Sequence, residues 1–325
     1  MPELTILQAV NLAIKEEMER NNDIIVLGED VAENGGVFRA TQGLVDQFGQ
    51  KRVMNTPLNE SGIIGFAVGM ALKGLRPIAE IQFADFIWPA TDQMLSEVAK
   101  FRYRSGGIYN LPMVIRTPYG GGIKGALHHS QSIETLFVHN AGIKVVIPSN
   151  PYDTKGLLTS ALRSDDPVLF LEPKPIYRAF KQEVPEGDYT VPIGKAAFPK
   201  RGKDVTLIAY GAMMPVVSEA AMILEEEYGI DAEIMDLRTL MPLDIKALEE
   251  TVKKTRRIIS VYEAPKTLGY GAELSALIAE RWIEYLEAPL FRVAGYDTPF
   301  PFTLEQDYLP DPYKVVEATI KSVNF

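Results

Sequence analysis

The sequence contains no cysteine, which excludes disulfides, thiolate metal sites and a cysteine nucleophile. It has no apolar run long enough to span a bilayer. Charges interrupt the apolar pattern of the first residues, which therefore predict an amphipathic helix and not a signal peptide. No basic run is present either, and the net charge of −10 argues against nucleic acid as a partner. We expect a cytoplasmic protein with no membrane and no nucleic-acid partner.

What is present is an ordinary globular composition, with 46% hydrophobic and 23% charged residues in a chain of 325. This length predicts two domains. Apolar runs of strand length alternate with helical patterns, which predicts α/β domains with open, largely parallel sheets covered on both faces. The predicted strands are 24–27, 53–55, 77–82, 114–115, 144–147, 168–171, 205–209, 232–236 and 258–261. The predicted helices are an opening helix and 42–48, 90–103, 152–163, 215–228, 247–254 and 271–283.

A stretch rich in proline, glycine and charge, from Lys174 to Gly202, interrupts this alternation. We therefore expect residues 1–180 to form one doubly wound domain, 181–202 a linker, and 203–325 a smaller doubly wound domain. Residues 62–74 are rich in glycine and apolar side chains. They are too apolar for a surface helix, which predicts that they are buried between layers.

The chain has only three histidines, and two of them are adjacent. His128 and His129 follow the glycine-rich loop Gly120–Gly122, which could present a general acid or base to a ligand. The alternative is a loop histidine bonded to a neighbouring carbonyl, and it stays open. Adjacent histidines point in different directions in an extended chain, so a zinc site is disfavoured and no metal ligand is predicted.

A carboxylate, Glu60, stands directly before the apolar glycine-rich segment. It is either an acidic residue stabilised by a helix amino terminus or a buried acid with a raised pKa, and the pattern favours the first. Gln82 and Phe86 follow a predicted strand, where ligands collect in open α/β sheets. Aromatic residues there are nonetheless more often part of a core. The residues alone predict a site near Glu60, Gln82, Phe86 and His129, without a reaction.

Several short stretches carry a more specific signal. They are Gly28–Val31, Gly35–Arg39, Asn55–Leu58 with Glu60, Ala79–Phe86, Phe101–Gly106, Ala126–Ser132, Lys144–Pro148, Asp236–Thr239 and Gly295–Pro299. In this order they resemble the β subunits of thiamin-diphosphate-dependent 2-oxo acid dehydrogenases, within the transketolase-like family. The resemblance runs from end to end and implies a pyrimidine-binding domain followed by a smaller C-terminal transketolase-like domain.

The resemblance implies a divided active site. In the family, thiamin diphosphate lies between an α and a β subunit, with its diphosphate and magnesium held mainly by α and its aminopyrimidine by β. This chain lacks a Gly-Asp-Gly followed at suitable distance by Asn-Asn, as expected for β. The implied partners are an α subunit in an α2β2 heterotetramer, a lipoyl acyltransferase and a small 2-oxo acid. Some relatives also hold a structural monovalent cation near the loop from Ser164 to Pro167.

The family's site residues are carried over by position. Glu60 matches the carboxylate that bonds the pyrimidine ring nitrogen, and Phe86 matches the aromatic residue that packs on the pyrimidine. His129 matches the histidine that assists acyl transfer to lipoamide. Gln82 and Leu58 lie in matching segments and are expected to line the cofactor pocket.

The resemblance is closer to the branched-chain enzymes than to the pyruvate enzymes, because of the segments Phe83–Phe86, His129–Ser132 and Gly295–Pro301. A pyruvate dehydrogenase β subunit is the alternative. A transketolase-like synthase half would need basic residues for a sugar phosphate, and none is evident around the His129 loop. A non-catalytic scaffold subunit is disfavoured because Glu60, Phe86 and His129 are all present.

Overall fold

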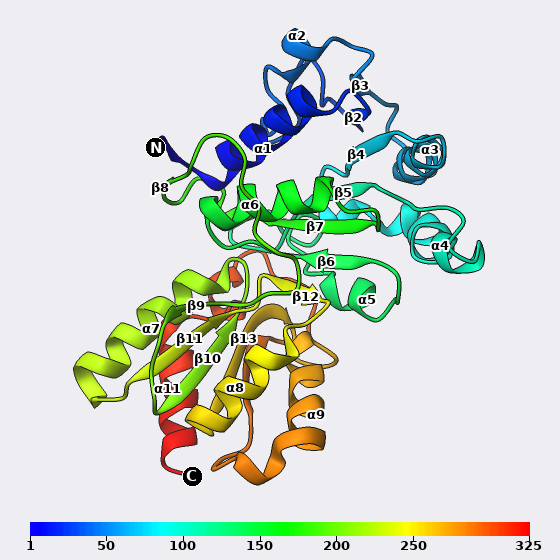
Figure 1. Ribbon diagram of the computed structural model, residues 1–325. Coiled ribbons are helices and arrows are strands. Elements are labelled where there is room, and N and C mark those ends of the chain that lie inside the picture. Colours follow the sequence, from blue (N-terminus) through cyan, green and yellow to red (C-terminus); the bar gives the residue numbers. More distant parts are fainter. The chain divides into compact units, whose positions relative to one another are not determined.

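The structure is a computed structural model that describes residues 1–325, and the chain forms two compact units (Figure 1). Unit 1 comprises Met1–Tyr119, Leu136–Ile193 and Leu240–Pro242, and unit 2 comprises Gly120–Thr135, Gly194–Thr239 and Leu243–Phe325. The loop that carries His128 and His129 thus belongs to unit 2, although its neighbours in sequence on both sides belong to unit 1.

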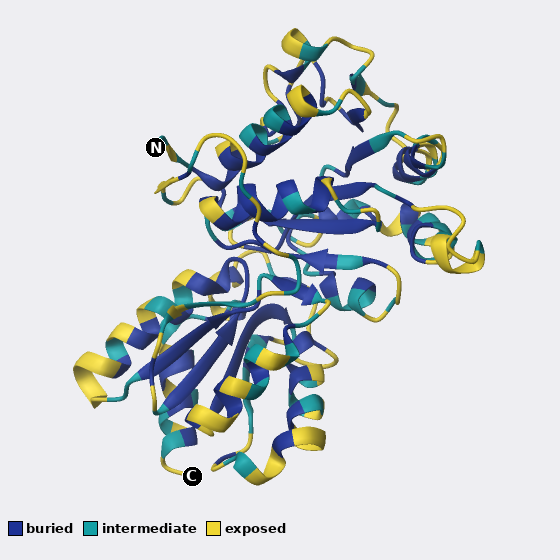
Figure 2. Cartoon of the chain, viewed as in Figure 1, coloured by how far each residue is buried: buried dark blue, intermediate teal, exposed yellow.

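Unit 1 is built on a seven-stranded sheet. Its order is β12 (Thr239–Met241), β6 (Lys144–Val146), β7 (Val168–Pro173), β5 (Val114–Tyr119), β4 (Arg76–Glu80), β2 (Ile24–Gly28) and β3 (Val53–Asn55). From β6 to β3 all neighbours pair in parallel. Figure 2 shows the central strands buried along their length, as parallel strands covered on both faces must be.

The helices of this unit are α1 (Ile6–Arg20), α2 (Leu44–Phe48), α3 (Glu60–Leu72), α4 (Phe101–Arg104), α5 (Glu134–Val138, shared with unit 2) and α6 (Pro151–Leu162). Helix α1 begins at a capping box in which Thr5 and Gln8 bond each other's backbone amides, and it packs against α6. None of the chain's helices is long and apolar enough to cross a membrane.

The helix predicted over 90–103 is present but is not a single regular α-helix. After 3-10 turns at Ala84–Phe86 and Trp88–Ala90, the chain forms a π-helix at Gln93–Val98, and a turn separates it from α4. The Ala99 N–H bonds the Met94 carbonyl five residues back, at 3.0 Å. Gly142 passes so close to this widened turn that a Cβ there would lie 1.8 Å from the Ala99 carbonyl oxygen. A contact with a segment distant in sequence thus accompanies the irregular turn at Ala99, and the local sequence pattern does not predict it.

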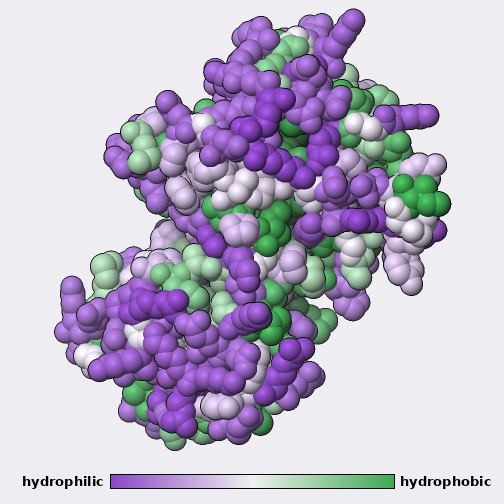
Figure 3. Space-filling model, viewed as in Figure 1, coloured by the Kyte–Doolittle hydropathy of each residue, from purple (hydrophilic) through white to green (hydrophobic).

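The prediction that residues 62–74 are buried between layers holds for only one face of the helix in this chain. Helix α3 buries one face, including Ile63, Ile64 and Ala67, against its own unit, whereas Phe66 is 57% exposed on the other. Figure 3 shows apolar atoms at the edge of unit 1 where α3 and α4 lie. The helix is therefore apolar on a face that this chain alone does not cover.

Unit 2 has a five-stranded sheet with the order β14 (Phe291–Gly295), β13 (Ile258–Pro265), β10 (Val205–Ala209), β11 (Ala232–Asp236) and β9 (Ala197–Lys200). All pairs are parallel except β9 with β11. Its helices are α7 (Met213–Tyr228), α8 (Ile245–Thr255), α9 (Tyr270–Trp282), α10 (Glu305–Tyr308) and α11 (Pro312–Val323). Helix α7 packs with α11 and α8 with α9, so the fold is doubly wound, as expected.

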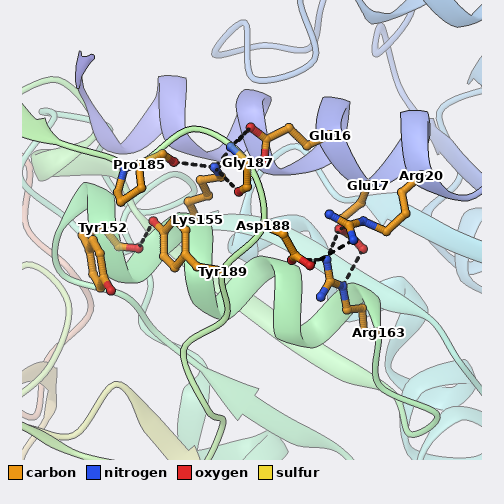
Figure 4. Close-up of polar contacts among 10 residues, drawn as sticks. All are labelled: Glu16, Glu17, Arg20, Tyr152, Lys155, Arg163, Pro185, Gly187, Asp188 and Tyr189. Carbon is orange, nitrogen blue, oxygen red and sulfur yellow. Dashed lines mark hydrogen bonds and ion pairs between the residues drawn. The ribbon is translucent and has the colours of Figure 1, made fainter. Parts of the chain in front are cut away.

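The segment expected as a linker, 181–202, contains structure of its own. Strand β8 (Gln182–Glu183) pairs with β1 (Glu3–Leu4), and β9 joins the second sheet. Between them, Pro185–Tyr189 lies along α1 and α6 (Figure 4). The buried Lys155 ammonium donates to the Pro185 and Gly187 carbonyls at 2.6 and 3.0 Å and pairs with Glu16 at 2.9 Å. These contacts tie the first half of the segment to unit 1.

Replacing Lys155 with methionine should therefore lower the free energy of unfolding by about 3 kcal/mol, since a buried ammonium's hydrogen bonds are lost and Glu16 loses its partner. Urea and thermal unfolding would measure the change. Lys321→Met is the matched control, because its exposed pair with Glu317 should contribute no more than about 0.5 kcal/mol. Equal shifts for the two variants would contradict this account of the segment.

Candidate acidic half-site

Unit 1 has a topological switch point between β2 and β4. From β2 the chain moves outward to β3, then returns across β2 to β4 on its other side. The crevice outside the carboxyl ends of such strands is where open α/β sheets bind ligands. Glu29 follows β2 directly, Glu60 begins the helix after β3, and Gln82 follows β4. The topology thus brings Glu60 and Gln82 to one edge of the sheet, as the sequence predicts.

Glu60 is the first residue of α3 and is only 8% exposed. It does not cap the helix, because the Asn59 side chain accepts the Gly62 N–H at 2.9 Å. The reading of Glu60 as a helix-end acid, which the sequence pattern favoured, is therefore incomplete. The Glu60 carboxylate lies buried at the N-terminal, positively polarised end of α3, next to Asn59, whose side chain already accepts the Gly62 N–H.

Glu29 is a second buried acid at this edge of the sheet, and the sequence pattern assigns it no role. It is 7% exposed, and its Oε1 atom has no hydrogen-bond partner within the chain. Burial raises the pKa of Glu29, and the negative charge of Glu60 raises it further. The signal in the sequence that identifies Glu29 is its position as an acidic residue directly after a predicted buried strand. The two carboxylates form an electrostatically coupled pair.

Phe86 ends a 3-10 turn and is partly exposed next to this edge. Its ring meets the ring of Phe83 edge to face, with centroids 5.3 Å apart, and Phe83 in turn meets Phe38 at 5.4 Å. Such a chain of aromatic contacts restricts the ring's orientation. The accessible part of Phe86 can therefore serve as a platform for a flat ligand ring. Leu58, by contrast, is 81% exposed.

A buried network of ion pairs joins neighbouring strands at the same edge of the unit 1 sheet. The Arg116 guanidinium donates two hydrogen bonds to Glu172, at 2.7 and 2.9 Å, and one to Glu80, at 2.7 Å. Burial alone would lower the pKa of Arg116, but Glu172 and Glu80 raise it above its usual value, so the group stays charged. Gly28 approaches Glu80 closely, since a Cβ there would lie 2.8 Å from the Glu80 carbonyl oxygen.

Comparisons with known proteins agree with this architecture. The model of the transketolase pyrimidine-binding domain matches residues 2–179, and that of the transketolase C-terminal domain matches 194–315. The mitochondrial 2-oxoisovalerate dehydrogenase subunit beta of Dictyostelium discoideum is 51% identical over 98% of this chain and 86% of its own length. The 2-oxoisovalerate dehydrogenase subunit beta of Bacillus subtilis is 49% identical over the whole of both chains. The chain belongs to the β subunits of the 2-oxo acid dehydrogenases.

Two further comparisons show how far the family assignment extends. The pyruvate dehydrogenase E1 component subunit beta of Bacillus subtilis is 48% identical over the whole of both chains, nearly as similar as the 2-oxoisovalerate proteins. A solved structure, described as a split-gene transketolase in an inactive β4 tetramer, has a TM-score of 0.81, 24% identity and 99% coverage of both chains. That likeness supports the fold alone. The family resemblance found in the sequence is confirmed, and as a β subunit the chain has an α subunit as partner.

The side chains at this edge of the sheet fit one end of thiamin diphosphate and not the other. They are carboxylates, an amide and aromatic rings, which suit a planar aminopyrimidine with ring nitrogens and an amino group. The unpartnered Oε1 of Glu29 and the buried Glu60 carboxylate would repel a diphosphate. In this β subunit the residues present therefore fit the pyrimidine half of the cofactor.

The loop with His128 and His129 belongs to unit 2. His128 is exposed and lines a cavity of about 350 Å³, together with Ser130 and Phe300. His129 is partly buried and does not line that cavity. The two adjacent imidazoles thus lie in different surroundings, although Leu127 and His128 form a turn and not an extended segment.

The loop from Ser164 to Pro167, where the resemblance predicts a monovalent cation, is contacted by two cationic side chains. Arg76 donates to the Ser164 carbonyl at 2.6 Å, and Lys144 donates to the Ser164 hydroxyl at 2.9 Å. The same two side chains pair with acids of the loop itself, Arg76 with Asp165 at 3.4 Å and Lys144 with Asp166 at 3.1 Å. Two oxygens of Ser164 therefore already have donors, and the cation stays a prediction.

The coupled acids predict a pH-dependent effect of Glu29→Gln. A carboxyl whose pKa is raised in the folded state stabilises the protein least at high pH, because the unfolded chain loses the proton first. The variant should thus gain about 1–2 kcal/mol at pH 7.5, the cost of keeping a negative charge buried beside Glu60, and lose that gain as pH falls toward 4. Thermal unfolding at both pH values would measure it.

Glu33→Gln provides an opposite-sign control. Its own backbone amide and the Gln50 side chain lower the pKa of Glu33, so neutralising it should decrease stability at pH 7.5 and matter less as pH falls. If Glu29→Gln were destabilising at pH 7.5, or its effect independent of pH, the raised pKa of Glu29 would be disproved.

Proposed function

We propose that this β subunit, together with an α subunit, decarboxylates a branched-chain 2-oxo acid and passes the acyl group to the lipoyl group of an acyltransferase. The observation that carries the proposal is the buried Glu60 at the switch point of unit 1, with Phe86 on the same edge. Bound between the subunits, thiamin diphosphate supplies the electron sink for loss of carbon dioxide.

The chain's own residues would then act on the pyrimidine side of the cofactor. Glu60 would share a proton with the pyrimidine ring nitrogen, which a buried carboxyl can do when solvent is excluded. Phe86 would pack on the pyrimidine face, and Gln82 and Leu58 would complete the pocket once the α subunit is in place. His129 would assist the transfer of the acyl group to lipoamide.

The proposed assembly is an α2β2 heterotetramer in which the α subunit holds magnesium and the diphosphate. The exposed apolar face of α3 supports this, because a face left bare in one chain is available for a partner. An acyltransferase is the proposed further partner. The cytoplasmic location expected from the sequence stays a prediction, since one relative is described as mitochondrial.

The substrate is proposed as branched-chain by a narrow margin. The segments Phe83–Phe86 and Gly295–Pro301 favour it, and so do the 51% and 49% identities to 2-oxoisovalerate dehydrogenase subunits. The 48% identity to a pyruvate dehydrogenase subunit keeps pyruvate as the second candidate. The α subunit would also line the acyl pocket, so the choice between them requires the complex.

Turnover of the reconstituted α–β complex tests the function directly. With thiamin diphosphate, magnesium and an artificial electron acceptor, kcat/KM for 2-oxoisovalerate should exceed that for pyruvate by about tenfold, the discrimination that one or two buried methyl groups provide. Preference for pyruvate would replace the substrate assignment. If neither acid were decarboxylated, the proposed function would be wrong.

Two variants should separate the roles of the acid and the histidine. Glu60→Gln should slow exchange of the thiazolium carbon-bound proton by about 100-fold, since general acid–base assistance is lost. His129→Ala should leave that exchange unchanged and impair acyl transfer to a lipoyl domain. NMR of quenched samples follows the first step and mass spectrometry of the lipoyl domain the second. A Glu60→Gln complex with normal exchange would remove Glu60 from the mechanism.

A further inference from the structure

The loop that carries His129 is shaped by its attachment to unit 2. It begins with Gly120–Gly122, and the Gly120 N–H bonds the Gln131 carbonyl at 3.1 Å, which closes the base of the loop. Lys124 and Ala126 have φ values of 56° and 55°, in the left-handed region that non-glycine residues rarely adopt. A loop with two such residues keeps one shape only when surrounding contacts hold it.

Two buried carboxylates supply such contacts. The Gly121 N–H donates to Glu263 Oε2 at 2.8 Å, the Gly122 N–H donates to Glu305 Oε1, and the Lys124 N–H donates to Glu305 Oε2 at 2.9 Å. Glu263 lies near the end of β13, and Glu305 begins α10. A charged carboxylate accepts stronger hydrogen bonds than a neutral oxygen does, and all three donors here are backbone N–H groups of the loop.

Apolar packing adds to these bonds. A Cβ on Gly121 would lie 2.4 Å from the Phe300 ring, so the loop backbone rests directly on that ring. Phe300 is buried and packs on Tyr308 of α10, with ring centroids 4.7 Å apart. The three residues Glu263, Phe300 and Glu305 are called the loop clamp below.

The far end of the loop is anchored as well. Glu134 is fully buried, burial raises its pKa, and the Tyr210 hydroxyl donates to its Oε1 at 2.8 Å. Both residues belong to unit 2. The segment that contains His129 is thus fixed to unit 2 before and after the histidine, while Glu60 belongs to unit 1.

We propose that Glu305, with Glu263 and Phe300, is a positioning residue that holds the His129 loop in the shape needed for acyl transfer. The proposal rests on the role of His129 proposed above. Glu305 is the critical member because both of its oxygens accept amide protons of the loop. Glutamine in its place offers one acceptor, and its NH2 group would face a second N–H.

The test uses the α–β complex with Glu305→Gln. Release of the clamp should slow acyl transfer to a lipoyl domain by about tenfold, a loss of about 1.4 kcal/mol in transition-state stabilisation. It should leave exchange of the thiazolium carbon-bound proton, the step assigned to Glu60, within about twofold of wild type. A general loss of folding would reduce both steps together.

Tryptic cleavage provides a readout that does not depend on activity. The bond after Lys124 lies inside the clamped loop, and its cleavage in the native complex should accelerate several-fold in Glu305→Gln. Asp307→Asn is the matched control, since Asp307 is an exposed acid on the same helix, and it should change neither the cleavage nor the transfer rate. If Glu305→Gln fails to fold, Glu305→Asp, which keeps both oxygens on a shorter stem, should give the same effects in weaker form.

The outcomes separate this proposal from the proposed function. Faster cleavage after Lys124 with slower acyl transfer supports the clamp. Faster cleavage with normal acyl transfer, or no change in either, overturns it. A wild-type complex without turnover on either 2-oxo acid would refute the proposed function, whereas the cleavage experiment would still show whether Glu305 holds the loop.

Discussion

One buried guanidinium holds the edge of unit 1 on which the site is built. Arg116 lies on β5 between Glu80 of β4 and Glu172 of β7, so a single side chain joins the carboxyl ends of three neighbouring strands. Removing Arg116 would leave two carboxylates buried without a cationic partner, which costs far more than an exposed ion pair contributes. This network restricts the strand ends from which the site residues emerge.

The positions of the site residues depend on these strand ends. The segment Ile81–Phe86 leaves β4 directly after Glu80, and the loop after β2 passes so close to the same carboxylate that a Cβ on Gly36 would lie 2.7 Å from Glu80 Oε1. With the edge held, Glu29 and Glu60 remain close enough in a low-dielectric setting for the charge of one to raise the pKa of the other.

The chain divides its chemical groups between two units. The acids and the aromatic platform belong to unit 1, whereas the histidine loop belongs to unit 2 and is bonded to that unit's own carboxylates. In a β subunit of a 2-oxo acid dehydrogenase this separates the group that would meet the pyrimidine from the group that would serve the acyl acceptor. Each of the two groups is thus held by the core of its own unit.

The sequence by itself determined the fold class, the strands with strong local patterns such as β3, β10 and β11, the family, and the placement of Glu60 and Gln82 at one sheet edge. These follow from apolar periodicity and motif order, which are short-range properties. Only the tertiary structure decided that Glu29 is buried close to Glu60, and that the Glu305 carboxylate accepts backbone N–H groups of the histidine loop. Such contacts join residues up to 183 positions apart, and local patterns carry no record of which distant backbone a side chain will meet.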